Sequence, residues 1–68
     1  MSDLTERERD IVRMIDEGLV VDDIAEAMYL SRSTIRAKVR RIARKLTGDE
    51  RRPWRDLPEV LARVDGEA

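Results

Sequence analysis

The chain has 68 residues, of which 43% are charged, and its formal net charge is −1 with a pI near 5.4. A chain of this length forms one small domain with a thin hydrophobic core. Cysteine and histidine are both absent, which excludes a disulfide framework and removes the commonest metal ligand and general base. The chain also lacks a glycine-rich loop and an evident carboxylate pair, so we expect no enzyme, no metal site and no cofactor.

The N-terminal residues 1–10 contain neither a basic region nor an apolar run, so they do not resemble a signal peptide. No apolar stretch approaches the length that crosses a bilayer. We therefore expect a cytoplasmic protein with no membrane partner.

Charge is distributed unevenly along the chain. Residues 1–30 carry nine acids and three bases, a net charge of −6, and residues 56–68 carry four acids and one base. Residues 31–55 carry ten bases and two acids, a net charge of +8. Surface charges are screened beyond about 8–10 Å at physiological salt. The central basic block can therefore attract a polyanion although the whole chain is weakly acidic.

Two helices are expected before the basic block. Thr5 and Glu8 have the spacing of a capping box, which predicts a helix from about Glu6 to Glu17 that ends at Gly18. A shorter helix should follow at residues 21–28, although the residue at its N-cap position is a valine, which caps poorly.

The next helix should span residues 32–46, with Ser31 as its N-cap. Its apolar residues recur every three or four positions and form one stripe, made of Ile35, Val39, Ile42 and Leu46. The opposite face contains Ser33, Arg36, Ala37, Arg40, Arg41 and Arg44. The segment has seven basic residues and no acidic one, a composition that suits contact with nucleic acid better than an isolated helix.

A polar linker at residues 47–55 should separate this helix from a last one, which starts near Asp56 and covers about 57–64. The linker contains Trp54, expected either to close the core under the last helix or to form an exposed anchor for a protein partner. Tyr29, at the turn before the basic helix, is expected to be half-buried. We assign residues 1–68 to a single domain with a core at 4–46.

Two helices separated by a short turn, the second of them basic, are typical of a helix-turn-helix, whose second helix enters the DNA major groove. The predicted fold is therefore all-α, a compact four-helix helix-turn-helix domain. Arg36, Ala37 and Arg40 lie together on the outer face and are the expected base contacts. Arginine can donate to guanine O6 and N7, and an alanine methyl can contact the thymine methyl.

Several spaced motifs resemble the C-terminal DNA-binding domain of the LuxR/GerE family of bacterial transcription regulators. They are Leu-Thr-Glu-Arg-Glu-Arg at 4–9, Gly-Leu at 18–19, Ile-Ala at 24–25, Leu-Ser-x-x-Thr-Ile-Arg at 30–36, and Ile42, Lys45 and Leu46. The resemblance implies a four-helix domain that places its third helix in the major groove and often dimerises through its fourth, here 57–64.

The resemblance also implies that Arg36, Ala37 and Arg40 match positions facing base edges, and that Thr34 and Lys38 match positions near phosphates. With the helix geometry it predicts DNA-backbone contacts from Ser31, Arg32, Ser33, Thr34, Lys38, Arg41, Arg44 and Lys45. The chain departs from the family at Val20, usually Ser or Thr, at Lys38, commonly His, and in its longer linker. We expect a stand-alone module of bacterial or phage origin, because no receiver or ligand-sensing domain accompanies it.

Two functions fit these observations. The first is a transcription regulator that binds double-stranded DNA, as a homodimer where the last helix provides an interface. The second is an interaction module, similar to the promoter-recognition region of sigma factors, that acts through RNA polymerase. The acidic first helices and Trp54 would serve the second function.

Overall fold

The computed structural model describes residues 4–66, and within that range it contains four α-helices and no strand. The elements are α1 (Glu6–Asp16), α2 (Val21–Met28), α3 (Arg32–Thr47), a short 3-10 helix η1 (Trp54–Asp56) and α4 (Leu57–Gly66). The all-α four-helix prediction is confirmed, and the helix ends differ from the predicted ones by at most two residues. The 3-10 helix η1, inside the predicted linker, was not anticipated.

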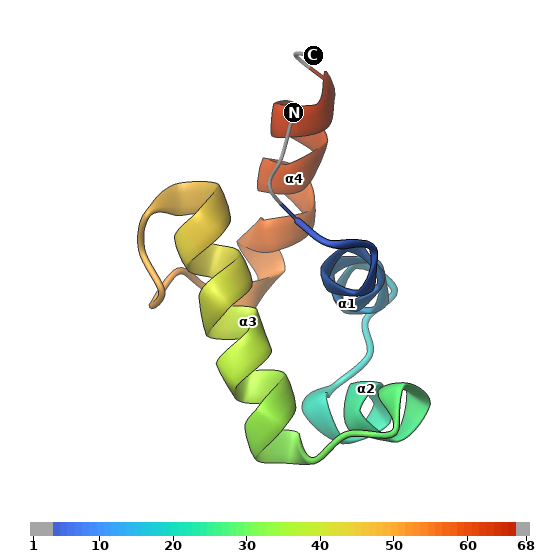
Figure 1. Ribbon diagram of the computed structural model, residues 1–68. Coiled ribbons are helices and arrows are strands. Elements are labelled where there is room, and N and C mark those ends of the chain that lie inside the picture. The colour runs from blue at the N-terminus through green and yellow to red at the C-terminus, as the bar shows by residue number, and fades with distance from the viewer. Residues whose placement is uncertain (1–3, 67–68) are drawn as a thin grey trace.

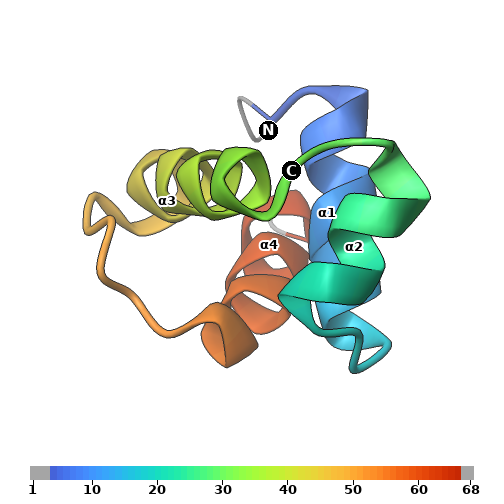
Figure 2. The same ribbon diagram turned by 90° about the horizontal axis from the view of Figure 1, so that it is seen from below.

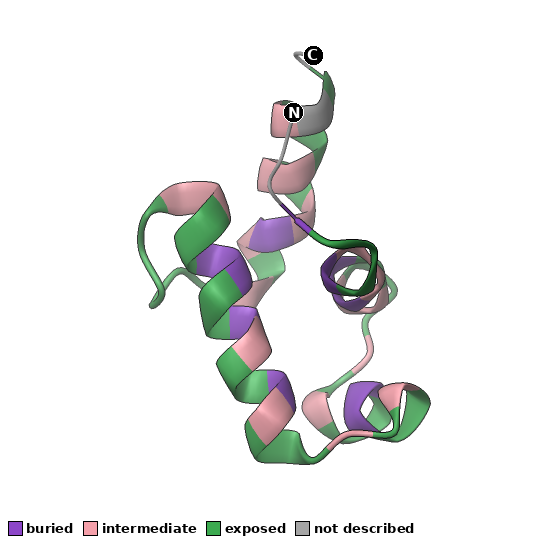
Figure 3. Ribbon diagram, in the orientation of Figure 1, coloured by how far each residue is buried: buried purple, intermediate pink, exposed green. Residues whose placement is uncertain are grey.

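Helix α3 lies along one side of the molecule, and α1, α2 and α4 all pack against it (Figures 1 and 2). The predicted stripe of α3 faces these helices: Ile35, Val39 and Ile42 are at most 1% exposed. Each of the other helices contributes a fully buried residue to the same core, namely Ile11, Ile24 and Leu57. Figure 3 shows the buried positions of α3 on its inner side. This arrangement turns the basic side of α3 outward.

The predicted caps fix where the helices begin and end. The Thr5 amide donates to Glu8 Oε1 at 2.9 Å and the Glu8 amide donates to Thr5 Oγ1 at 3.2 Å, so both arms of the capping box are present. Ser31 Oγ accepts the Thr34 amide at 3.1 Å at the start of α3. Gly48 ends α3 with a φ of +78°, a left-handed conformation that glycine adopts without steric cost.

The turn between α2 and α3 differs from expectation at Tyr29. Its φ of 57° is left-handed, and its side chain is 94% exposed, so the expectation of half-burial was wrong. The left-handed residue ends α2 and allows the Leu30 amide to donate to the Ala25 carbonyl at 2.9 Å. The turn thereby directs Leu30, rather than Tyr29, against the core.

An ion pair links the start of α1 to the end of α3. Lys45 Nζ lies 2.9 Å from Glu8 Oε1, and the Glu8 side chain is only 7% exposed. The carboxylate that caps α1 therefore also holds α3 in place. Among the described helices, none is long and apolar enough to cross a membrane.

Candidate nucleic-acid interface

The outer face of α3 is open to solvent along its length. All six residues predicted for this face are exposed: Ser33, Arg36, Ala37, Arg40, Arg41 and Arg44. Figure 3 shows exposed positions recurring along the side of α3 that faces away from the other helices. The sequence periodicity thus identified the solvent-facing side of this helix correctly.

The basic side chains of this face lack partners within the protein. Within residues 4–66, no ion pair or side-chain hydrogen bond involves Arg36, Lys38, Arg40, Arg41 or Arg44. On two other helices an arginine does have a carboxylate partner: Arg13 pairs with Asp10 on α1, and Arg63 with Glu59 on α4. Five neighbouring cations without counter-charges repel one another, and a bound polyanion would relieve that repulsion.

The three predicted base contacts lie in consecutive turns of this face. Arg36 and Arg40 are four residues apart, so their side chains are neighbours along the helix surface. Ala37 lies beside them and lines a shallow hollow of about 390 Å³ together with residues of the first two turns, namely Ser33, Thr34, Lys38 and Arg41. The small side chain of Ala37 leaves room there for a base edge.

Four predicted backbone contacts at the start of α3 already have partners, including Ser33, whose Oγ lies 3.4 Å from Ser31 Oγ. Ser31 Oγ is 2.8 Å from Thr34 Oγ1, so both hydroxyls belong to the helix cap. Arg32 Nε lies 3.0 Å from Asp22 Oδ1, with both side chains more than half exposed. Exposed pairs of this kind contribute little to stability, so Arg32 can exchange Asp22 for a phosphate.

Lys45 differs most from its expected role. Its amine binds the buried Glu8 carboxylate, which no spacing rule could indicate because the two residues are 37 positions apart. Burial alone would raise the pKa of the Glu8 carboxyl. Hydrogen bonds from Thr5 and Lys45, with the positive charge of Lys45, outweigh burial and lower that pKa below its usual value. Lys45 therefore has a structural role in addition to the phosphate contact predicted for it.

The linker belongs to the basic block 31–55, which the sequence predicts to attract a polyanion, and the structure places it beside α3. In Figures 1 and 2 the chain between α3 and η1 extends past α3 on the side away from α1 and α2. The linker contains Arg51, Arg52 and Arg55, all exposed. The net charge of +8 over residues 31–55 therefore includes three arginines that lie outside α3.

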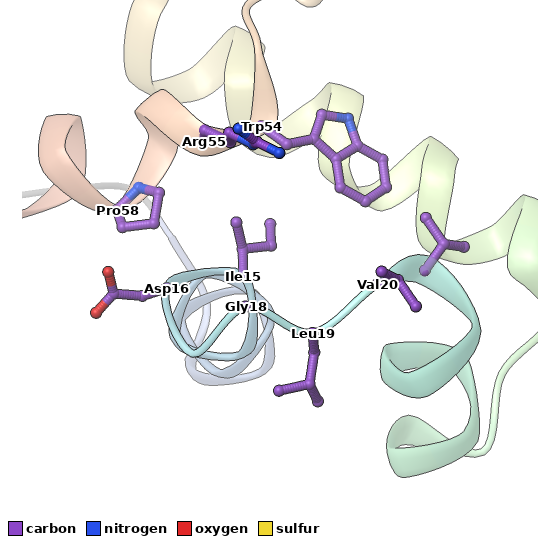
Figure 4. A pocket seen from close by; sticks show the side chains of 9 residues that line it. Ile15, Asp16, Gly18, Leu19, Val20, Trp54, Arg55 and Pro58 are labelled. Atoms are coloured by element: carbon purple, nitrogen blue, oxygen red, sulfur yellow. The ribbon is translucent and has the colours of Figure 1, made fainter.

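A separate apolar groove lies where η1 faces the connection between α1 and α2. Trp54 is part-buried against the core, and its ring extends over that connection toward Val20, which is 60% exposed (Figure 4). The groove measures about 580 Å³ and is also lined by Ile15, Leu19 and Pro58. Trp54 therefore helps to close the core under the last helix, which is the first of the two roles expected of it. Part of its side chain also faces the groove.

Comparison with known proteins gives one match. A family profile described as "GerE: Bacterial regulatory proteins, luxR family" matches residues 2–52. Searches of curated proteins and of solved structures gave no significant match. The matched range contains α1, α2 and α3 and ends within the linker.

Proposed function

Since the chain belongs to the GerE family of luxR-type bacterial regulatory proteins, we propose that it is a transcription regulator that inserts α3 into the major groove of its operator. The family is one of DNA-binding regulatory domains and not of enzymes. The observation that carries the proposal is the row of exposed arginines on the outer face of α3 that pair with no side chain within residues 4–66, namely Arg36, Arg40, Arg41 and Arg44. A helix fits the major groove, and its exposed side chains then meet both base edges and phosphates.

Within this proposal, Arg36, Ala37 and Arg40 read bases, and the phosphate contacts come from the flanks of α3. The residues that we expect to make these contacts are Ser31, Arg32, Ser33, Thr34, Lys38, Arg41, Arg44 and Lys45. Phosphate contacts fix the position of the helix on the duplex without selecting a sequence. Base contacts from two arginines then select the site.

Substitution of the two arginines tests this assignment. Arg36→Ala and Arg40→Ala should each cost about 1–3 kcal/mol on the cognate site and relax base preference at one position. The measurement is competition of each variant against a randomised duplex library. Arg41→Ala is the control, because loss of a phosphate contact should weaken cognate and random DNA by the same factor. Equal losses for every sequence with Arg36→Ala and Arg40→Ala would refute base reading by α3.

Dimerisation through α4 is the second part of the proposal. Val60 and Val64 lie one turn apart on α4 and are both part-exposed, so a second copy could bury them. A dimer would present two copies of α3 to a palindromic operator, one helical turn of DNA or a multiple of it apart. Sedimentation of the protein with and without operator DNA distinguishes a monomer from a dimer.

The alternative function, action through RNA polymerase, is favoured by the groove between Trp54 and Val20. An exposed apolar side chain beside a tryptophan is typical of the centre of a protein interface. In this alternative the purified protein would shift promoter DNA only when polymerase is present. A shift by the purified protein alone favours the regulator.

A further inference from the structure

We propose that the linker between α3 and η1 is a second DNA-contacting element, in which Arg51 binds a phosphate of the duplex backbone outside the segment read by α3. The inference rests on the proposed function, because it extends the same interface. It concerns residues 48–53, between α3 and η1, of which 48–52, Arg51 included, form the C-terminal end of the family match at 2–52.

Two hollows join the linker to the outer face of α3. The first measures about 380 Å³ and is lined by Arg40 from α3 and by Glu50, Arg51, Arg52 and Trp54. The second measures about 360 Å³ and is lined by Arg44 from α3 and by Gly48, Asp49, Glu50 and Arg51. Arg51 lines both hollows, so it lies beside Arg40 in the first and beside Arg44 in the second.

Hydrogen bonds order the linker at both ends. Thr47 Oγ1 accepts the Asp49 amide at 3.1 Å, and Asp49 Oδ1 accepts the Arg51 amide at 2.9 Å. At the other end Arg52 Nε donates to Asp56 Oδ2 at 3.0 Å, which ties the linker to η1. The backbone that carries Arg51 is therefore held in a defined turn, and less conformational entropy is lost when its side chain binds.

The Arg51 side chain itself is uncommitted. It is exposed, and within residues 4–66 it makes no ion pair or side-chain hydrogen bond, as is also true of Arg40 and Arg44. Arg44 and Arg51 line the second hollow together and supply two cations for an anion with several acceptor oxygens, while Arg40 remains available to a base edge. A phosphodiester fits this chemistry, because arginine donates to phosphate oxygens in a planar, bidentate fashion.

The length of α3 explains why this phosphate would lie outside the reading segment. A helix of 16 residues is roughly 24 Å long at 1.5 Å per residue, whereas the major groove is about 12 Å wide. Recognition helices contact base edges with their N-terminal residues. The C-terminal half of α3, with Arg44, then passes over the edge of the groove, and the linker beside it meets the sugar-phosphate backbone.

Glu50 gives the inference a sharp test because it is the one acidic residue that lines both hollows. A phosphate bound there would lie near its carboxylate. Glu50→Gln should therefore raise affinity for DNA, whereas Arg51→Gln should lower it. If the linker does not contact DNA, neither substitution should change the affinity by more than the small effect of the altered net charge.

The experiment measures DNA affinity of the full chain as a function of salt, on cognate and random duplexes. Arg51→Gln should reduce the log–log salt slope by about 1 and lower affinity about fivefold at 0.15 M salt, equally for both duplexes, as loss of one phosphate contact requires. Arg13→Gln on α1 is the matched control. It removes the same charge from α1, the helix that Figures 1 and 2 show on the side of α3 away from the linker.

A second measurement uses a shorter duplex. Trimming the duplex to the segment read by α3 removes the flanking phosphates and should abolish the difference between Arg51→Gln and the unsubstituted chain. If Arg51→Gln behaves like Arg13→Gln on the long duplex, the inference is overturned while the proposed function stands. If the unsubstituted chain binds no DNA even at low salt, the proposed function and the inference fail together.

Discussion

At the scale of single residues, Glu8 has two functions that a sequence shows only in part. Its carboxylate completes the capping box with Thr5 and also accepts from Lys45. The pKa of Glu8 is lower in the folded chain than its usual value. A carboxyl with a lowered folded pKa stabilises the fold above its unfolded pKa, about 4.3, and loses that contribution as the pH falls through the folded pKa.

We therefore expect Glu8→Gln to lower the free energy of unfolding by about 1–3 kcal/mol at pH 7, since it removes a buried charge partner of Lys45. The difference from the unsubstituted chain should shrink below about pH 4.3, where protonation of Glu8 has the same effect. Urea titrations between pH 7 and pH 3 measure it. Glu6→Gln is the control, because Glu6 is exposed on the same helical turn. A difference that stays constant with pH would contradict this account.

The residues that sequence reasoning placed correctly depend on local rules. Thr5, Glu8 and Ser31 cap the helices that follow them, and these contacts span only three residues. The partner of Lys45 lies 37 residues away, and the exposure of Tyr29 follows from its left-handed backbone. Tertiary contacts and single backbone conformations leave no periodic signal, so these two features could not be predicted.

At the scale of the helices, the boundaries followed from capping chemistry and from apolar spacing. The apolar stripe of α3 predicted which side of the helix is buried. The opposite side, which contains the candidate site, was therefore expected to be exposed, and it is. The linker was less predictable. Its polar composition indicated a loop, but the 3-10 helix η1 and the position of Arg51 beside α3 depend on how Trp54 packs against the core.

Helix α2 begins at a residue that does not cap it. Val20 has extended backbone angles, a φ of −92° and a ψ of 170°, and contributes no side-chain hydrogen bond. These angles suit an N-cap serine, whose hydroxyl would accept an amide of the first turn of α2. Val20→Ser should raise the free energy of unfolding by about 0.5–2 kcal/mol, because Val20 is 60% exposed and little burial is lost.

Chemical denaturation of Val20→Ser checks this expectation. Val21→Ser is the matched control: Val21 is one residue further on and packs against the core, so its substitution should destabilise the chain. If Val20→Ser also destabilises, the valine contributes more through the groove shared with Trp54 than a cap would. The groove would then be part of the folded core rather than a surface free for a partner.

At the scale of the whole molecule, positive charge is gathered on one side although the chain is acidic. The net charge of −1 results from a basic block at 31–55 and acidic segments before and after it. The molecule measures 32 × 20 × 19 Å, so its opposite surfaces are separated by more than the Debye length of about 8 Å at 0.15 M salt. Acids on the far side then have little influence on a duplex held against α3.

The salt dependence of DNA binding follows from this separation. If the interface neutralises about six phosphates, log affinity should fall against log salt concentration with a slope near −5, despite the acidic pI of about 5.4. Equilibrium titrations from 50 to about 200 mM salt measure the slope. Arg41→Gln should make it shallower by about 1, because Arg41 is exposed on α3 and has no partner within residues 4–66. Arg13→Gln, on α1 and paired with Asp10, should leave the slope unchanged. If both substitutions change the slope equally, DNA binding depends on the total charge of the protein and not on one face of it. A slope of zero would exclude the phosphate contacts altogether.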